Sequence, residues 1–306
     1  MMKLACRFNR TLDHSLLLGN QPDSDELAKA IAAAVANGPK RFDPSAMLKK
    51  PILHPGHITV IKGVEGKQVL LEERSPIGNQ GRLGSCTANR RADGLELVQP
   101  KANVTQISRL GIYWPSRAQH GDECNDSGSY SHVSAAIVEN VGVCREDLWP
   151  YDDTPPPGEP GGSPDAPMLL RPPLLAYEDM YDHRLPAGAI QRIRGSGKGR
   201  VYQVIAALDC GFPVGIDASV DQAFCDGPDP NTAVVSPTRP IGGHAILLVG
   251  YLERSDGTYW FRLRNSWGRG WGENGYCWIA DSYLADAMAV DDVDVTTMSP
   301  IWSKAA

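Results

Sequence analysis

A recurring pattern of apolar positions follows a glycine-bearing turn in the first third of the chain. The apolar residues recur at the i, i+4, i+7 spacing of one helix face: Ala88, Ala92 and Leu95. Ser85 precedes this face as a candidate N-cap, and Pro100 stops the run. The pattern therefore predicts a helix that carries Cys86 in its first turn.

Short apolar runs in the second half of the chain predict strands. Pro213 to Val220 alternates apolar and small residues, another run begins at His244, and a third spans Tyr259 to Leu263. Runs spaced in this way are typical of an antiparallel sheet or barrel. We expect the second half to be rich in strands.

Helical spacing recurs elsewhere. An amphipathic pattern predicts a helix from Asp23 to Asn37, and apolar faces between Ile107 and Gly142 predict helices that pack against the Cys86 helix. A short helix is expected from Val201 to Leu208, and a terminal helix after Asp281. The first half is thus expected to be mainly helical.

A proline-rich stretch separates the two halves. Thr154 to Pro173 holds eight prolines and three glycines, which exclude a helix or an internal strand. Its length suggests an excursion where the chain crosses from one half to the other. A plain connector and a segment that shapes a substrate site both remain open.

Charge and composition exclude some classes of function. The 306 residues carry a formal net charge of -6, and no block of Lys and Arg indicates a nucleic-acid partner. No apolar run reaches the ~18–20 residues of a membrane span. The cluster Leu16-Leu17-Leu18 is too short for a secretory signal, so we expect a cytoplasmic protein or one exported without a standard leader.

The cysteines give little sign of a metal site or a disulfide framework. Besides Cys86, six remain at spacings that fit no metal pattern: Cys6, Cys124, Cys144, Cys210, Cys225 and Cys277. We expect few disulfides or none, no metal and no cofactor.

Cys86 is the candidate nucleophile. The N-terminus of a helix favours a thiolate, although a lone cysteine there is more often a small buried hydrophobe. His244 at the head of a strand and Asn265 after another strand supply a base and an amide that orients it. Gln80, six residues before Cys86, can bring a side-chain amide to the same point.

The motifs around these residues occur in a distinctive order. They are Asn79-Gln80-Gly81, Gly84-Ser85-Cys86, His244-Ala245 before Val249-Gly250-Tyr251, Asn265-Ser266-Trp267-Gly268, and Trp271-Gly272-Glu273-Asn274-Gly275-Tyr276. From about Leu70 to Ala280 the chain resembles the papain family of cysteine proteases. The resemblance implies an α+β, papain-like two-lobed fold, with a helical left lobe, an antiparallel β-barrel-like right lobe and the active-site cleft between them.

The resemblance also implies roles for individual residues. Cys86 would be the nucleophile, His244 the acid and base, Asn265 the group that orients His244, and Gln80 an oxyanion donor. Substrate-binding roles are implied for four others: Gly128, Ser129, Gly243 and Trp267. The partner would be a peptide or protein substrate. Gly243 offers no charge to the neighbouring pocket, so no charged residue is favoured at the second substrate position.

Three features modify the resemblance. Leu83 stands where many family members carry a disulfide-forming cysteine, and Thr87 replaces a common aromatic. The form of the nucleophile motif, together with Gly142-Val143-Cys144, is similar to a bacterial branch of the family.

The resemblance divides the chain into three parts. Residues 1–62 would be an N-terminal extension, 63–174 the helical lobe and 175–306 the β-rich lobe. We hypothesise that Phe42 to His57 crosses the cleft and keeps the enzyme latent, and the alternative is an extension packed on one lobe. The expected function is a cysteine endopeptidase acting through a thioester acyl-enzyme. An idle peptide-binding homologue and an acyl transferase are the alternatives.

Overall fold

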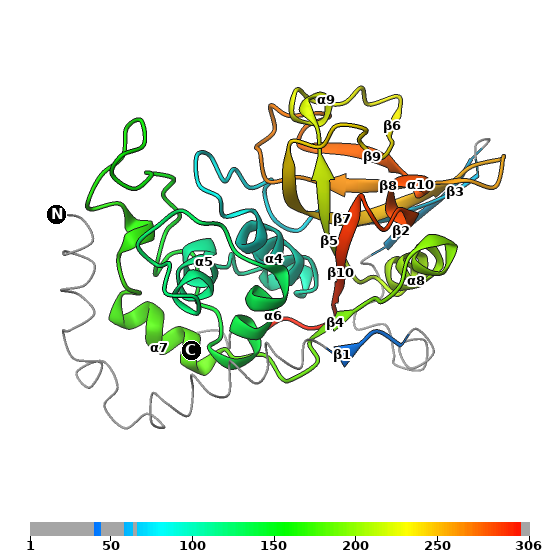
Figure 1. The fold of residues 1–306 in the computed structure, drawn as a ribbon. Coiled ribbons are helices and arrows are strands. Elements are labelled where there is room, and N and C mark those ends of the chain that lie inside the picture. Colours follow the sequence, from blue (N-terminus) through cyan, green and yellow to red (C-terminus); the bar gives the residue numbers. More distant parts are fainter. Residues whose placement is uncertain (1–39, 44–57, 64–65, 301–306) are drawn as a thin grey trace.

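The computed structural model describes residues 40–43, 58–63 and 66–300. The helix expected from Asp23 to Asn37 lies outside these residues. The described chain forms two packed lobes, one of helices and one built on a β-sheet (Figure 1). The prediction of an α+β, two-lobed fold is confirmed.

The helical lobe is built around one buried helix. Its helices are α4 (Cys86–Leu97), α5 (Arg109–Ala118), α6 (Ser131–Asn140) and α7 (Leu174–Asp182), with short 3₁₀ turns at Lys101–Asn103 and Pro167–Leu169. The predicted apolar face of α4 is buried against α5 and α6, where it contacts a common core with Leu110, Tyr113 and Val138. This packing holds the N-terminus of α4 toward the second lobe.

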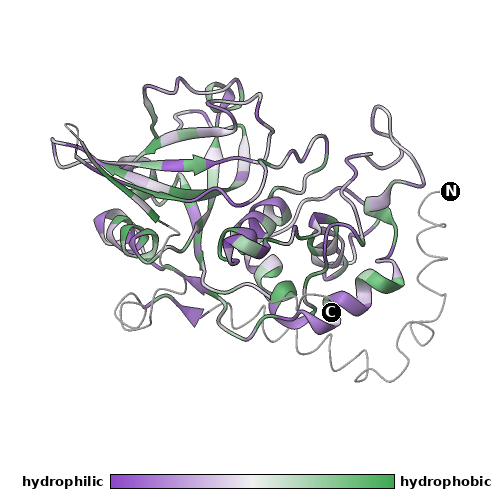
Figure 2. Ribbon diagram, turned by 180° about the vertical axis from the view of Figure 1, so that it is seen from behind, coloured by the Kyte–Doolittle hydropathy of each residue, from purple (hydrophilic) through white to green (hydrophobic). Residues whose placement is uncertain are grey.

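The second lobe contains a ten-stranded sheet in the order β1-β4-β10-β5-β7-β8-β9-β6, with a β2–β3 hairpin beside β7. Its strands are β1 (Lys40–Arg41), β2 (Ile58–Gly63), β3 (Gly66–Leu71), β4 (Ile190–Arg192), β5 (Val214–Val220), β6 (Ala233–Val234), β7 (Gly242–Glu253), β8 (Tyr259–Arg264), β9 (Tyr276–Ala280) and β10 (Val290–Thr296). Helices α8 (Gly197–Asp209), α9 (Gln222–Cys225) and α10 (Asp281–Ala285) pack on it. Hydrophobic residues are concentrated in its central strands (Figure 2).

The sheet is curved, but it does not close into a barrel. Within the described residues its two ends, β1 and β6, pair only with β4 and β9, and both of these pairings are parallel. The expected strands at β5, β7 and β8 are present and pair antiparallel as predicted.

Packing divides the chain differently from the expected boundaries. Strand β3 precedes the nucleophile but pairs with β7 in the sheet lobe. Helix α7 begins at residue 174, where the helical lobe was expected to end, but it buries Ala176 and Met180 in the helical core. The proline-rich stretch forms no strand, as predicted, but it does form the 3₁₀ turn Pro167–Leu169, contrary to the prediction. Met168 of this turn packs in the helical core, so the crossing between lobes comes later.

The N-terminal extension contributes one buried side chain to the described structure. Phe42 packs in the core of the sheet lobe, and its N–H donates to the carbonyl of Arg192 at 2.8 Å. Strands β1 and β2 both lie away from the end of the sheet where β7 begins (Figure 1). Phe42 is therefore not in the cleft, contrary to our hypothesis, while residues 44–57 lie outside the described part.

Two further expectations concern the chain as a whole. None of the described helices is long and apolar enough to cross a membrane. Cys124 is disulfide-bonded, whereas the free thiols are those of Cys86, Cys144, Cys210, Cys225 and Cys277. At least one disulfide is therefore present.

Candidate active site

Cys86 is the first residue of α4, as the apolar pattern predicts. Ser85 occupies the N-cap position, but its side chain makes no capping hydrogen bond. Its hydroxyl instead lies 2.6 Å from that of Tyr151, which donates to the carbonyl of Gln80 at 2.9 Å. The Ser85 hydroxyl also accepts Nδ2–H of Asn89 in α4 at 3.0 Å, so Ser85 links the turn before the nucleophile to the helix through side chains.

His244 lies near the start of β7 and pairs with Asn265. Its Nε2 is 2.7 Å from Oδ1 of Asn265, and Oδ1 also accepts the backbone N–H of Ser266 at 2.8 Å. Because this oxygen is acceptor-only, Nε2 of His244 carries a proton. In the neutral ring, Nδ1 therefore holds the free lone pair.

Gln80 is held by hydrogen bonds at both ends of its amide. Its Oε1 accepts the hydroxyl of Ser266 at 2.7 Å, and its Nε2 donates to the carbonyl of Leu83 at 2.9 Å. An amide nitrogen carries two N–H groups, so one donor remains after this bond. Gln80 also lines the cleft that contains Cys86.

One cleft of about 700 Å³ collects seven of the eight predicted site residues. They are Gln80, Cys86, Gly128, Ser129, Gly243, His244 and Trp267. The eighth, Asn265, is buried and reaches the cleft through His244. Residues separated by up to 187 positions in sequence thus meet at the junction of the two lobes.

An aromatic cluster covers the His244–Asn265 pair. The ring of Trp267 stacks on the imidazole with centroids 4.5 Å apart. Phe224 of α9 lies 5.7 Å from Trp267, and Trp271 lies 5.0 Å from Phe224. Sequence reasoning predicted Trp267 as a site residue but missed Phe224 and Trp271. The motif containing Trp271 was a signal for it, whereas Phe224 had no comparable signal.

Asp126 braces the turn that carries the nucleophile, and sequence reasoning missed it. Its two carboxylate oxygens accept the N–H of Gly84 at 3.0 and 2.9 Å, and it also accepts the hydroxyl of Tyr113. That same hydroxyl accepts the N–H of Gly128 at 3.2 Å. A carboxylate network therefore connects the turn at Gly84 to the loop at Gly128, next to Leu83, where the family commonly has a disulfide.

Thr87, which departs from the family pattern, contacts the predicted substrate-binding residue Ser129. The hydroxyls of Thr87 and Ser129 are hydrogen-bonded across the cleft floor. Thr87 is buried, so its hydroxyl needs such a partner. Ser129 supplies that partner.

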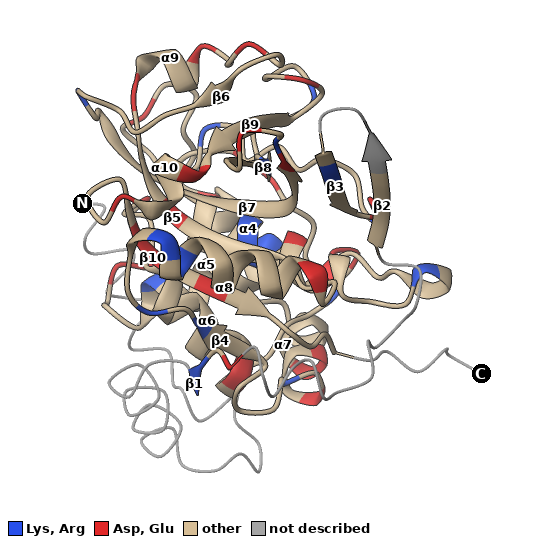
Figure 3. Cartoon of the chain, turned by 90° about the vertical axis from the view of Figure 1, so that its right-hand side faces the viewer, with Lys and Arg blue, Asp and Glu red and all other residues tan. Residues whose placement is uncertain are grey.

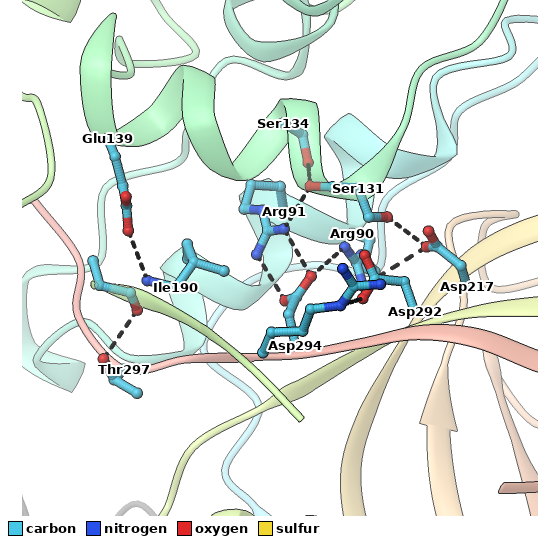
Figure 4. Close-up of polar contacts among 12 residues, drawn as sticks. Arg90, Arg91, Ser131, Ser134, Glu139, Ile190, Asp217, Asp292, Asp294 and Thr297 are labelled. Carbon is cyan, nitrogen blue, oxygen red and sulfur yellow. Dashed lines mark hydrogen bonds and ion pairs between the residues drawn. The ribbon is translucent and has the colours of Figure 1, made fainter. Parts of the chain in front are cut away.

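Buried ion pairs fix α4 against the sheet. Arg90 and Arg91 contact Asp294 of β10, with nitrogen–oxygen distances of 2.8 and 2.9 Å (Figure 4). On another side of α4, Asp93 accepts Nε of Arg264 from β8 at 2.7 Å. In Figure 3 these basic positions of α4 lie inside the molecule, behind the strands. The helix bearing Cys86 is therefore tied to the sheet bearing His244.

Burial disfavours charge on both candidate reacting groups. It raises the pKa of the Cys86 thiol, against the hydrogen bond from the backbone of Ala245, which lowers it. Burial also lowers the pKa of His244 to about 4, against the hydrogen bond to Asn265, which raises it. Opposite charges on adjacent groups would stabilise each other. The expected thiolate–imidazolium pair remains a prediction.

The chain matches a known family over most of its length. The model of the papain family cysteine proteases matches residues 72–293.

The described residues contain no group of three or more His, Cys, Asp or Glu side chains arranged to hold a metal ion.

Individual proteins are similar to this chain over about two thirds of its length. An uncharacterized peptidase C1-like protein of Acanthamoeba polyphaga mimivirus is 31% identical over 223 residues, which are 70% of this chain and 67% of that protein. Ananain of Ananas comosus is 27% identical over 67% of this chain and 52% of its own length. The chain thus spans about half to two thirds of these relatives.

Solved structures extend the likeness to the fold. Xylellain, a cysteine protease from Xylella fastidiosa, superposes with a TM-score of 0.65 and 27% identity, covering 86% of this chain and 92% of that one. Digestive procathepsin L 3 of Tenebrio molitor has a TM-score of 0.56 at 17% identity over 93% of this chain and 81% of that one, and shows the fold alone. The chain belongs to the papain family of cysteine proteases.

Proposed function

We propose that the protein is a cysteine endopeptidase that hydrolyses peptide bonds through a thioester acyl-enzyme. The observation that carries this proposal is the hydrogen bond between His244 and Asn265 in the cleft that contains Cys86. It leaves Nδ1 of the imidazole as the base available to the thiol. The expected assignment to a bacterial branch is in keeping with the similarity to xylellain and remains a proposal.

The chemistry would proceed in two steps. Sulfur of Cys86 attacks the peptide carbonyl while Nδ1 of His244 takes the thiol proton, and the imidazolium then protonates the departing amine as the C–N bond breaks. Water next attacks the thioester, with His244 as base, and cleavage of the C–S bond releases the acid and restores the thiol. Asn265 would keep the ring oriented through both steps.

The surrounding residues would stabilise the charged intermediate and place the substrate. The Cys86 backbone N–H and the remaining Nε2–H of Gln80 are the candidate oxyanion donors, each worth about 3–4 kcal/mol in comparable sites. Gly128 and Ser129 would bind the substrate backbone as an added strand, and Gly243 would border it on the other side. Trp267 would shield the His244–Asn265 hydrogen bond from water.

Labelling with a thiol-directed epoxide inhibitor tests this proposal. We expect one equivalent to attach to Cys86, with loss of peptide hydrolysis in proportion. Cys86→Ala should abolish both. Cys225→Ala is the matched control, because Cys225 is another partly exposed free thiol, and it should change neither. Labelling without hydrolysis would instead favour the peptide-binding homologue, and product formed with added amines would favour an acyl transferase.

Latency through the N-terminal extension is a separate proposal. Deleting residues 1–57 should raise peptide hydrolysis if the extension limits access to the cleft. Because this deletion also removes buried Phe42, deletion of residues 1–39 is the control that keeps it. Urea unfolding of both variants separates relief of inhibition from loss of stability. Unchanged hydrolysis in both folded variants would refute latency.

A further inference from the structure

A smaller cavity lies beside the Cys86–His244 pair. Its volume is about 230 Å³, several times the roughly 30 Å³ that one water molecule occupies in the liquid. Its walls include Tyr130, Gly243 and Ala245, and it contains two carboxylates, those of Asp217 and Asp291. No Lys or Arg is among its lining residues in the described structure. A side chain that entered it would meet carboxylates as its charged neighbours.

A β-bulge places these carboxylates. Ala218 of β5 pairs with Val290 of β10 and Ile216 pairs with Val293, so Asp217 lies opposite two residues, 291 and 292. A bulge of this kind re-aims side chains and is frequent beside active sites. On the other side of β5, Asp217 pairs with Ala245 of β7, which is next to His244. The acidic wall is therefore fixed to the strand that carries the candidate base.

The nearby arginines make their shortest contacts with carboxylates outside the cavity. Arg90, which is 1% exposed, makes its short contact with Asp294 at 2.8 Å and reaches Asp217 only at 3.9 Å (Figure 4). Arg192 pairs with Asp292 at 2.7 Å. Arg91 is likewise paired with Asp294. The closest contacts of these three arginines are thus with Asp292 and Asp294, and neither of those carboxylates lines the cavity.

Both cavity carboxylates retain capacity for a ligand. Asp217 accepts the hydroxyl of Ser131 at 2.5 Å, and its side chain is 29% exposed, so it is accessible from the cavity. Burial raises the pKa of Asp217, whereas the charge of Arg90 lowers it. An added cation would stabilise the charged form of Asp217. Asp291 is exposed and forms no ion pair with the described residues, and Arg200 acts on it only at longer range.

We propose that this cavity selects a lysine or arginine side chain of the peptide substrate, held by Asp217 and Asp291. The proposal rests on the proposed peptidase function. It corrects the expectation drawn from Gly243 alone, because the charge comes from β5 and β10 rather than from the residue before His244. With the substrate backbone along Gly128 and Ser129, the selected side chain is the second one on the acyl side of the scissile bond.

Fluorogenic peptides that differ only at this position provide the test. Arginine is compared with citrulline, which has nearly the same shape and no charge, and with lysine, leucine and glutamate. We expect kcat/KM for arginine and lysine to exceed that for citrulline by about 10- to 100-fold, the size of one hydrogen bond between charged groups. Equal rates for arginine and citrulline would overturn the proposal and leave the peptidase function intact.

Two variants locate the effect. Asp291→Asn, at an exposed position, and Asp217→Asn should each lower the ratio of the arginine rate to the citrulline rate. Asp256→Asn, in an exposed turn, is the control and should change neither. A cation preference that survives both cavity variants would overturn the proposal. If no peptide is cleaved, binding of the arginine and citrulline peptides to Cys86→Ala tests the proposal. Tighter binding of the arginine peptide supports it, and equal affinities refute it.

Discussion

Oδ1 of Asn265 lies 2.7 Å from Nε2 of His244 and accepts the Ser266 N–H as well. These two bonds set the amide and the imidazole in one orientation. In Asn265→Ala both donors lose their acceptor inside the protein, which costs about 1–3 kcal/mol in unfolding free energy. The ring would also lose its fixed orientation.

We expect kcat/KM of Asn265→Ala to fall at least tenfold. This is part of the ~10²–10⁴-fold rate acceleration that a positioned general acid and base contributes. Asn265→Asp keeps an acceptor and should retain more activity than Asn265→Ala. Steady-state kinetics beside urea unfolding measures both effects. Equal activity in the alanine variant and the parent would show that His244 needs no such partner.

Acid should destabilise the fold through His244. Its pKa is about 4 in the folded protein, below its ordinary value of 6.5. The unfolded chain therefore binds the proton more tightly, and this contribution to stability is present above about pH 6.5 and is lost as pH falls toward 4. Its size is about 3 kcal/mol.

Urea unfolding between pH 7 and pH 4 measures this contribution in Cys86→Ala, where no thiolate can stabilise the imidazolium. The matched variant Cys86→Ala/His244→Gln lacks the titrating ring but keeps the carboxylates. We expect the single variant to lose about 3 kcal/mol more than the double variant. Parallel curves for the two variants would disprove the shift.

Removing one member of the buried charge network should cost far more than removing an exposed partner. Among the described residues, Asp294 is the only carboxylate that both Arg90 and Arg91 contact closely. Asp294→Asn removes its negative charge. Breaking a buried pair costs about 3–5 kcal/mol because a charge is left without compensation. Glu73→Gln removes the exposed pair with Arg269 and should cost about 0–1 kcal/mol. Chemical denaturation compares them, and similar losses would contradict the account.

Gly215 makes room for a buried arginine. A Cβ at this position would lie 2.1 Å from Nη1 of Arg90, a side chain held by Asp294. We expect Gly215→Ala to lower the unfolding free energy by about 1–3 kcal/mol through overpacking. Gly199→Ala in α8 is the control, since a Cβ there meets nothing within 4 Å and alanine favours a helix by about 1 kcal/mol. Thermal melts should therefore shift in opposite directions.

Regular spacing made part of the fold predictable. Ala88, Ala92 and Leu95 indicate α4 because one apolar face of a helix is visible in the sequence. The burial of the other faces of α4 is not visible in the sequence, because Arg90 and Arg91 would ordinarily be assigned to solvent. They are buried because Asp294, more than 200 positions later, pairs with them.

The chemical residues were predictable from their motifs, whereas their supports were not. Cys86, His244 and Gln80 come together as expected. Asp126 and Asp217 do not stand out in the sequence, because their roles depend on a loop contact and on a bulge between strands. Such pairings arise only in the folded chain.

The central claim is a covalent intermediate on one sulfur atom. Rapid quenching of the protein with a peptide ester, followed by proteolysis and mass spectrometry, measures it most directly. The account predicts a transient acyl adduct on the peptide that contains Cys86, which disappears as product forms and is absent from Cys86→Ala. Hydrolysis at the parent rate in Cys86→Ala, with no adduct on the parent protein, would contradict it.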